Sequence, residues 1–161
     1  MHIVTAKGVA LLALCCMFAE AVAAEPAEVM SQDGLAEVIR SIDPNATGSG
    51  RVLEFSFGQV RMASVSDGVH GRMRIVAPVG PVAELTSAQV VAIMDANYHT
   101  TLDARYGSSE GVLYAAFIHP LAPLTVGQVR SAVRQVASLV KTFGTTFSSG
   151  ELSYGNQGQA L

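Results

Sequence analysis

Three residues whose side chains could do chemistry recur at steps of four in the stretch MDANYHTTLDARYG, residues 94–107: Asp95, His99 and Asp103. Residues four apart lie on one face of an α-helix. If this stretch is helical, a carboxylate, an imidazole and a second carboxylate therefore point the same way. Such a set could bind a metal ion or act as an acid–base pair, or it could be the solvated face of an ordinary amphipathic helix.

Helix geometry argues against a shared metal ion. A rise of about 1.5 Å per residue places Asp95 and Asp103 about 12 Å apart along the axis, whereas metal–oxygen bonds are about 2 Å long. His119, at the end of the last predicted strand, could add a ligand only if it folds nearby. Asp103 is also expected near the helix C-terminus, where the dipole disfavours an anion, so an ion pair with Arg105 or a local hydrogen bond suits it better. We interpret these residues first as helix surface, second as partner or dimer contacts, and last as metal-binding or catalytic residues.

Other chemical signatures are weak. The sequence contains no phosphate-binding loop and no His-Glu-x-x-His motif, and we expect no Gly-x-Ser-x-Gly nucleophile elbow. His70 beside Gly71 is typical of a solvated turn. Asn97, inside a helical pattern, is expected to cap a neighbouring loop or, alternatively, to lie in an interface. We therefore expect no enzyme, no cofactor and no metal ion.

Residues 1–24 have the three parts of a secretory signal peptide. A short basic segment ends in Lys7, an apolar run broken only by Glu20 follows, and small residues offer cleavage after Ala23 or Ala24. The run is short for a membrane span, which takes about 20 apolar residues, although a retained anchor is an alternative. We expect the segment to be removed and the mature protein to be exported to the periplasm.

Both cysteines, Cys15 and Cys16, lie in this segment. They suggest a lipoprotein as another alternative, but Leu14 precedes Cys15, and lipidation favours a small residue there. A cysteine-free mature chain has no disulfide, zinc thiolate or cysteine nucleophile. The net charge of −3 at pH 7 argues against a nucleic-acid binder, which usually carries an excess of Lys and Arg.

Hydrophobic periodicity predicts helices and strands in the order α-β-β-β-α-β-β-α. The expected elements are a helix at 33–42, three strands between 52 and 77 joined by turns at Gly58-Gln59 and Asp67-Gly68, a helix from Thr86 or Ser87 to about Leu102, strands at 104–107 and 112–118, and a helix from Thr125 to Phe147. Because strands and helices are grouped, we expect an α+β fold with a five-stranded, mainly antiparallel sheet and helices packed on one face. The domain is predicted to cover residues 25–147, with a loose tail at 148–161.

Three helical stripes are expected to form the core against this sheet. Their members are Leu35, Val38, Ile39 and Ile42 in the first helix; Val90, Val91, Met94, Tyr98, Thr101 and Leu102 in the second; and Val126, Val129, Val133, Val136, Val140, Phe143 and Phe147 in the third. The spacing of the third stripe could also form a coiled-coil seam. Its flanking positions lack the alternating charges of such a seam, so a core helix is favoured.

Strand pairing places three arginines on the outer face of the sheet. With two-residue turns, Arg61 faces Arg74, and Arg72 lies in the row of Glu54. Directly opposed like charges on a sheet are unfavourable, so Arg61, Arg72 and Arg74 are predicted to recruit an anion. The alternative is that the three side chains are splayed apart in water, where exposed charges couple weakly.

The segments ANYHTTLDARYG and FIHPLAPLT, within residues 35–153, resemble the YbjN-type bacterial sensory transduction regulator family. That family is similar in fold to the class I chaperones of type III secretion. The resemblance implies a non-enzymatic domain that engages protein partners, and a homodimer in which the helix at 86–102 lies at the two-fold axis. We expect partner or dimer contacts at Tyr98, His99, Asp103, Arg105 and His119.

Three functions are compatible with the sequence. The first is an exported chaperone-like or regulatory domain that binds a protein or peptide, although the predicted signal peptide speaks against the cytoplasmic escort of effectors. The alternative is a periplasmic domain that binds a small ligand or anion through the outer-face arginines. The third, a hydrolase with a His–Asp pair, is the least favoured. Neither nucleic-acid binding nor stable membrane insertion is expected.

Overall fold

The computed structural model describes residues 29–150. Its elements are α1 (Gln32–Ile42), β1 (Thr47–Ser49), β2 (Val52–Phe57), β3 (Val60–Asp67), β4 (Arg72–Pro81), the 3₁₀ turn η1 (Val82–Glu84), α2 (Ser87–His99), β5 (Arg105–Ser109), β6 (Val112–Pro120) and α3 (Val126–Thr142). The predicted signal peptide and residues 151–161 of the predicted tail lie outside the described residues. The start of that tail is attached to the domain, because Ser149 is buried and its hydroxyl accepts a hydrogen bond from the Leu102 amide, 2.6 Å.

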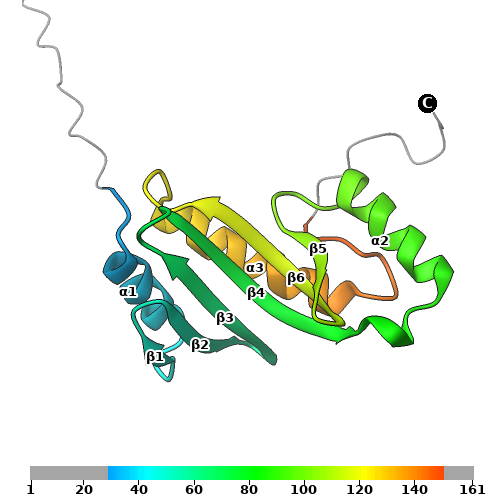
Figure 1. Cartoon of the computed structure of the whole chain (residues 1–161), viewed down its shortest axis with the longest axis horizontal. Coiled ribbons are helices and arrows are strands. Elements are labelled where there is room, and N and C mark those ends of the chain that lie inside the picture. Colours follow the sequence, from blue (N-terminus) through cyan, green and yellow to red (C-terminus); the bar gives the residue numbers. More distant parts are fainter. Residues whose placement is uncertain (1–28, 151–161) are drawn as a thin grey trace, which may run out of the picture.

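The strands form one antiparallel sheet in the order β1-β2-β3-β4-β6-β5. Residues alternate along β2, β3, β4 and β6 between buried and more exposed positions, so only one face of the sheet is covered. Helices α1 and α3 pack against the covered face, whereas α2 contacts β5 (Figure 1). The predicted α+β fold and antiparallel sheet are confirmed. The expectation that every helix packs on one face is wrong for α2, which lies beyond the β5 edge.

The sheet has six strands rather than the predicted five. The additional strand, β1, lies in the Gly-rich segment after the first helix, where no strand was predicted, and Thr47 pairs with Glu54. All three of its residues are exposed, so no hydrophobic alternation marks it. Gly48 has φ +96°, and a Cβ there would collide with the carbonyl oxygen of Val52.

Each helix begins at a side-chain cap, as expected from the sequence for α2 and α3. Thr86 and Thr125 each accept a hydrogen bond from the amide three residues later, where Gln89 and Gln128 complete capping boxes. Ser31 caps α1 in the same way. The core joins the stripes of α1 and α3 to the inner face of the sheet through Leu35, Ile39, Ile75, Val129, Val133, Val136 and Leu139.

Helix α3 ends at Thr142, five residues before the predicted end at Phe147. Gly144 follows with φ +78°, a left-handed conformation that stops a helix. Phe143 and Phe147 still reach the core, because both rings pack edge to face against Tyr106 at centroid distances of 6.2 Å. The two rings are therefore partly buried against the core, as predicted, but they lie beyond the end of the helix.

The predicted buried stripe of α2 is wrong for its four members within the helix. Their relative exposures are 42% for Val90, 58% for Val91, 67% for Met94 and 68% for Tyr98. Thr101 is buried as predicted and Leu102 is partly buried, but both lie beyond the end of the helix. The buried positions of the helix are Ile93 and Ala96. Apolar residues surround α2 on most sides, so the periodicity could not reveal which side meets the narrow edge of the sheet.

The predicted register between β3 and β4 is also wrong, whereas the β2–β3 register is confirmed by the Ser56–Arg61 pair. Residues 68–71 form a four-residue connection, in which one carboxylate oxygen of Asp67 accepts hydrogen bonds from the amides of Val69 (3.0 Å) and His70 (3.2 Å). Val65 therefore faces Arg74, where a two-residue turn would place His70. The shift is an even number of residues, so every side chain keeps its predicted face.

Candidate functional site

The Asp95–His99–Asp103 series does not form a site. Helix α2 ends at His99, so Asp103 lies beyond it. The Asp103 amide donates to the side-chain oxygen of Gln135 (2.9 Å), and Gln135 donates back to the Asp103 carboxylate (3.3 Å). Within residues 29–150, no group of three His, Cys, Asp or Glu residues could hold a metal ion. The local hydrogen bond predicted for Asp103 at the helix–strand junction is the arrangement found.

The five predicted contact residues fall into three separate places. Tyr98 and His99 end α2, with their rings edge to face at 4.7 Å. Asp103 and Arg105 belong to the α2–β5 junction, where the Arg105 guanidinium donates to the carbonyls of Leu102 and Ala104. His119 lies on β6, stacked on Phe117 at 5.7 Å, and its Nδ1 contacts the Pro120 carbonyl at 2.7 Å. The five residues thus come from the end of α2, the α2–β5 junction and β6, and their role as partner or dimer contacts stays a prediction.

Asn97 attaches α2 to the edge of the sheet. Its side-chain nitrogen donates to the Tyr106 carbonyl (3.0 Å), and its side-chain oxygen accepts from the Tyr106 amide (2.8 Å). The amide side chain thus replaces a neighbouring strand at that residue of β5, which protects an otherwise unpaired edge. Tyr106 is fixed further by its hydroxyl, which donates to the Leu139 carbonyl (2.6 Å).

The prediction that the sequence lacks a Gly-x-Ser-x-Gly motif is wrong, because one lies in the β5–β6 hairpin. Residues 107–111, GSSEG, have the Gly-x-Ser-x-Gly spacing of a nucleophile elbow, which requires a strand–turn–helix context. Here the segment joins two strands, with Glu110 and Gly111 at φ +49° and +77° in a tight turn. The His70–Asp67 pair lies at the other end of β6, about 26 Å away at a strand rise of about 3.3 Å per residue. This histidine–carboxylate pair is therefore too far away to activate a serine of the motif.

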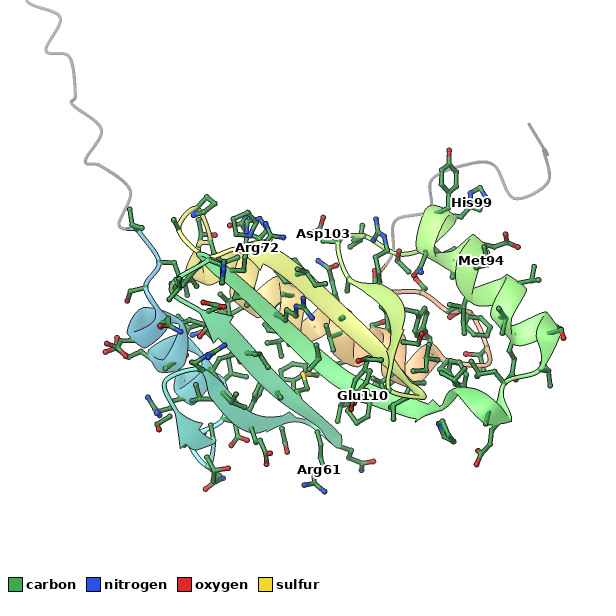
Figure 2. The ribbon with its side chains drawn as sticks, in the orientation of Figure 1. Arg61, Arg72, Met94, His99, Asp103 and Glu110 are labelled. Atoms are coloured by element: carbon green, nitrogen blue, oxygen red, sulfur yellow. The ribbon has the colours of Figure 1, made fainter. Side chains whose placement is uncertain are left out.

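The first candidate surface is the α2 apolar face, formed by Val90, Val91, Met94 and Tyr98. These positions follow three- and four-residue spacing and so form one stripe on the helix. Met94 and His99 lie at the end of the molecule opposite α1 (Figure 2). The four side chains are exposed although Asn97 of the same helix contacts β5, so they are available to another surface.

The second candidate surface is the outer-face groove, a hollow of ≈ 640 Å³ across the uncovered face of β3, β4, β6 and β5. Its apolar floor consists of Val65, Val76, Tyr114, Ala116 and Ile118. Ile118 is 49% exposed within this floor, so about half of its side chain is available to a ligand. The floor offers apolar area to a ligand.

One end of the outer-face groove is cationic. Arg51, His70, Arg72 and Arg74 line it, together with the carboxylate of Asp67. Asp67 is already engaged by His70 at 2.8 Å and Arg51 at 3.8 Å. The side-chain hydrogen bond from His70 is the main reason that the pKa of Asp67 lies below its ordinary value of 3.8.

The predicted cluster of three arginines is divided. Arg72 and Arg74 lie in the outer-face groove, whereas Arg61 lines a different hollow with Asp43 and Glu54. Arg61 and Arg72 are at opposite ends of the sheet (Figure 2). The four-residue connection after Asp67 causes this separation, because it pairs Arg74 with Val65 instead of Arg61. All three arginines keep the predicted outer face.

Two solved structures share this architecture. A chain in the structure of the HopA1-SchA chaperone-effector complex aligns with a TM-score of 0.53 and 12% identity, over 68% of this chain and 88% of that chain. A chain in the ExsC-ExsE complex aligns with a TM-score of 0.53 and 13% identity, over 68% of this chain and 90% of that chain. The chain has a chaperone-like fold.

Sequence comparison adds no family to this structural likeness. No family model matches the chain, and no curated protein sequence matches it. Membership of the YbjN-type family therefore stays a prediction. The chaperone-like fold that the resemblance implied is supported by the two solved structures, and the two candidate surfaces are described on that fold.

Proposed function

We propose that this protein is a non-enzymatic, chaperone-like domain that binds a protein or peptide partner and acts as a homodimer. The α2 apolar face carries the proposal. Its helix is capped at Thr86 and bound to β5 through Asn97, yet Met94 and Tyr98 are two-thirds exposed. Contiguous exposed apolar side chains on a rigid element are typical of a protein-binding surface.

A second copy of the chain is the simplest occupant of this face. A two-fold interface brings one patch against itself, so a single helix with an apolar stripe is self-complementary. Burial of apolar surface stabilises such contacts by about 25 cal/mol per Å². The edge-to-face pair of Tyr98 and His99 would then lie near the axis.

The fold neighbours support protein binding, because both are chains of protein complexes, one of them described as a chaperone-effector complex. The arrangement of titratable groups supports a non-enzymatic role. His70 and Asp67 form a histidine–carboxylate pair, but the carboxylate also holds the β3–β4 turn through two backbone amides. Asp67 thus has a structural task that accounts for its contacts.

We further propose that the protein works outside the cytoplasm after removal of residues 1–24. The support is the sequence pattern described above, with its basic start, apolar run and small residues before the cleavage position. Within residues 29–150, no helix is both long and apolar enough to cross a bilayer.

Light scattering of the mature protein tests the dimer. The wild type should have the mass of two chains at micromolar concentration, and Met94→Glu should have the mass of one, because each substitution places a charge in the interface twice. The matched control is Val69→Glu, which changes a valine that is 91% exposed in the β3–β4 turn. A monomeric wild type at high micromolar concentration removes the homodimer from the proposal.

Affinity capture from envelope extract tests the partner. The tagged wild type should retain a protein in a fixed ratio, and that protein should bind the purified domain again when it is mixed with it alone. Retention of no protein above the level of an unrelated tagged domain would contradict a protein-binding function.

The outer-face groove favours a second candidate function, the binding of a small ligand or anion. A ligand that binds only the folded state raises the melting temperature. A thermal-shift screen of small carboxylates, phosphates and sulfates therefore separates this function from protein binding. A shift that Arg72→Gln abolishes would favour the small-ligand function.

A further inference from the structure

The outer-face groove differs from the α2 apolar face because it combines apolar and cationic surface. Its floor is apolar, and one end carries guanidinium groups. Arg72 and Arg74 lie two residues apart on one face of β4, so their side chains start about 7 Å apart. Within residues 29–150 neither arginine has a salt bridge, and the nearby carboxylate of Asp67 is engaged by Arg51 and His70.

Charge complementarity identifies the occupant. Paired guanidinium groups bind carboxylates through charge-assisted, often bidentate hydrogen bonds. A small anion would engage only these groups and leave Val76 and Ile118 uncovered. A chain that carries carboxylates at one end and aliphatic side chains beside them matches the cationic end and the floor together.

The shape of the groove also suits a chain segment. It extends over β3, β4, β6 and β5, which span about 14 Å at the usual strand spacing. Small-molecule sites normally bury most of their ligand, whereas this groove lies on the open face of a sheet. No residue of α2 lines it, so a dimer formed through the α2 apolar face leaves it accessible.

We propose that the outer-face groove binds an acidic peptide segment with aliphatic side chains, contributed by a partner protein. This proposal rests on the proposed protein-binding function and names the chemistry of the partner. The carboxylates of the segment contact Arg72 and Arg74, and its aliphatic side chains cover Val76, Tyr114 and Ile118.

The test is selection from a library of random dodecapeptides against the mature protein, followed by affinity measurement of the enriched peptides by fluorescence anisotropy. Enriched sequences should be net acidic and contain Leu, Ile or Val. The double substitution Arg72→Gln and Arg74→Gln should weaken their binding at least tenfold and reduce its dependence on salt. Ile118→Ser should weaken binding severalfold.

Arg61→Gln is the matched control, because it removes an outer-face arginine from the other hollow and should leave the affinity unchanged. Circular dichroism and light scattering of each variant establish that the fold and oligomeric state are retained. If the Arg72/Arg74 variant binds as tightly as the wild type, or if no acidic sequence is enriched, the proposal is wrong, whereas the dimer and its α2 test stand independently.

Two further measurements decide the source of the segment. Deletion of residues 151–161 should leave the peptide affinity unchanged, and a tenfold increase would identify the chain's own end as the occupant and overturn the proposal. Phosphatidylglycerol vesicles should bind more weakly than the selected peptides. Tighter vesicle binding that depends on Arg72 and Arg74 would identify a membrane surface and overturn it as well.

Discussion

At the scale of single residues, buried polar side chains determine how the α2–β5 junction is built. Gln135 is almost fully buried, and its side-chain oxygen accepts hydrogen bonds from the amides of Asp103 (2.9 Å) and Ala104 (3.0 Å). Buried backbone amides without partners are costly, so this one side chain on α3 stabilises the turn into β5. Asp103 consequently belongs to a structural hydrogen-bond network, in which its carboxylate accepts a hydrogen bond from Gln135 (3.3 Å).

Tyr106 gives the clearest pH dependence at this scale. Burial raises the pKa of Tyr106 from 10.0 to about 12. Between these values the unfolded chain releases the phenolic proton while the folded chain retains it, so the free energy of unfolding falls as the pH rises. At neutral pH, Tyr106→Phe should reduce stability by about 1 kcal/mol, because the buried Leu139 carbonyl loses its donor.

Urea unfolding at neutral pH and at pH values between 10 and 12 measures this effect. The stability difference between the wild type and Tyr106→Phe should narrow with rising pH, because only the wild type has this proton to lose. Tyr98→Phe, at an exposed tyrosine, is the control and should stay close to the wild type throughout. A difference that is constant across the range would refute the assignment to Tyr106.

At the scale of elements, α2 packs against the edge of the sheet while four of its large apolar side chains stay exposed. It touches the sheet through β5, where Ile93 and Ala96 are its buried residues and Asn97 makes two hydrogen bonds to Tyr106. A helix of this kind keeps its position while its opposite side meets a partner. The same arrangement protects the β5 edge, which would otherwise invite pairing with other chains.

Asn97→Ala tests the attachment of α2. The substitution removes both hydrogen bonds to Tyr106 and should reduce the free energy of unfolding by about 2 kcal/mol. Hydrogen exchange of the Tyr106 amide should accelerate more than that of amides in α3. Asp95→Ala, on the exposed side of the same helix, is the matched control and should change stability little. Equal stability of the two variants would show that Asn97 does not hold the helix.

At the scale of the whole molecule, the two candidate surfaces lie on different elements. The α2 apolar face belongs to the β5 edge of the sheet, and the cationic end of the outer-face groove lies at the β3–β4 turn. A dimer through α2 would therefore present two outer-face grooves. Self-association through the α2 apolar face and partner binding in the outer-face groove would therefore use different residues. The substitutions proposed for each surface test the two functions independently.

Export is a property of the whole chain and is tested by mass spectrometry of the protein purified from its native compartment. The mature chain should begin at Ala24 or Glu25 and contain no cysteine. Leu12→Arg, which interrupts the apolar run, should leave the precursor uncleaved. Recovery of Cys15 and Cys16 in the mature wild-type protein would contradict cleavage.

The sequence by itself determined the features that depend on neighbouring residues. Helix starts at Thr86 and Thr125 were predictable because a capping box is a local pattern of hydrogen-bonding side chains. The core stripe of α1 and the β2–β3 register were predictable because periodicity records which face is buried. The same holds for the α3 stripe from Val129 onward, whereas its predicted first member, Val126, is 48% exposed at the start of the helix. The same alternation predicted that the three arginines lie on the outer face of the sheet. That prediction was correct despite the wrong β3–β4 register, because a shift by an even number of residues leaves each side chain on the same face.

Only the tertiary structure decided which surfaces remain uncovered. The sequence could not show that α2 lies at the edge of the sheet, because its apolar residues fit burial on several sides and the choice depends on the space that α1 and α3 already occupy. Arg61 and Arg74 are separated because the connection after Asp67 has four residues. In that loop the Asp67 carboxylate accepts hydrogen bonds from the amides of Val69 and His70, a conformation that the assumption of a two-residue turn did not include. Both candidate surfaces come from these tertiary choices, since exposure is a property of the assembled fold and not of any single segment.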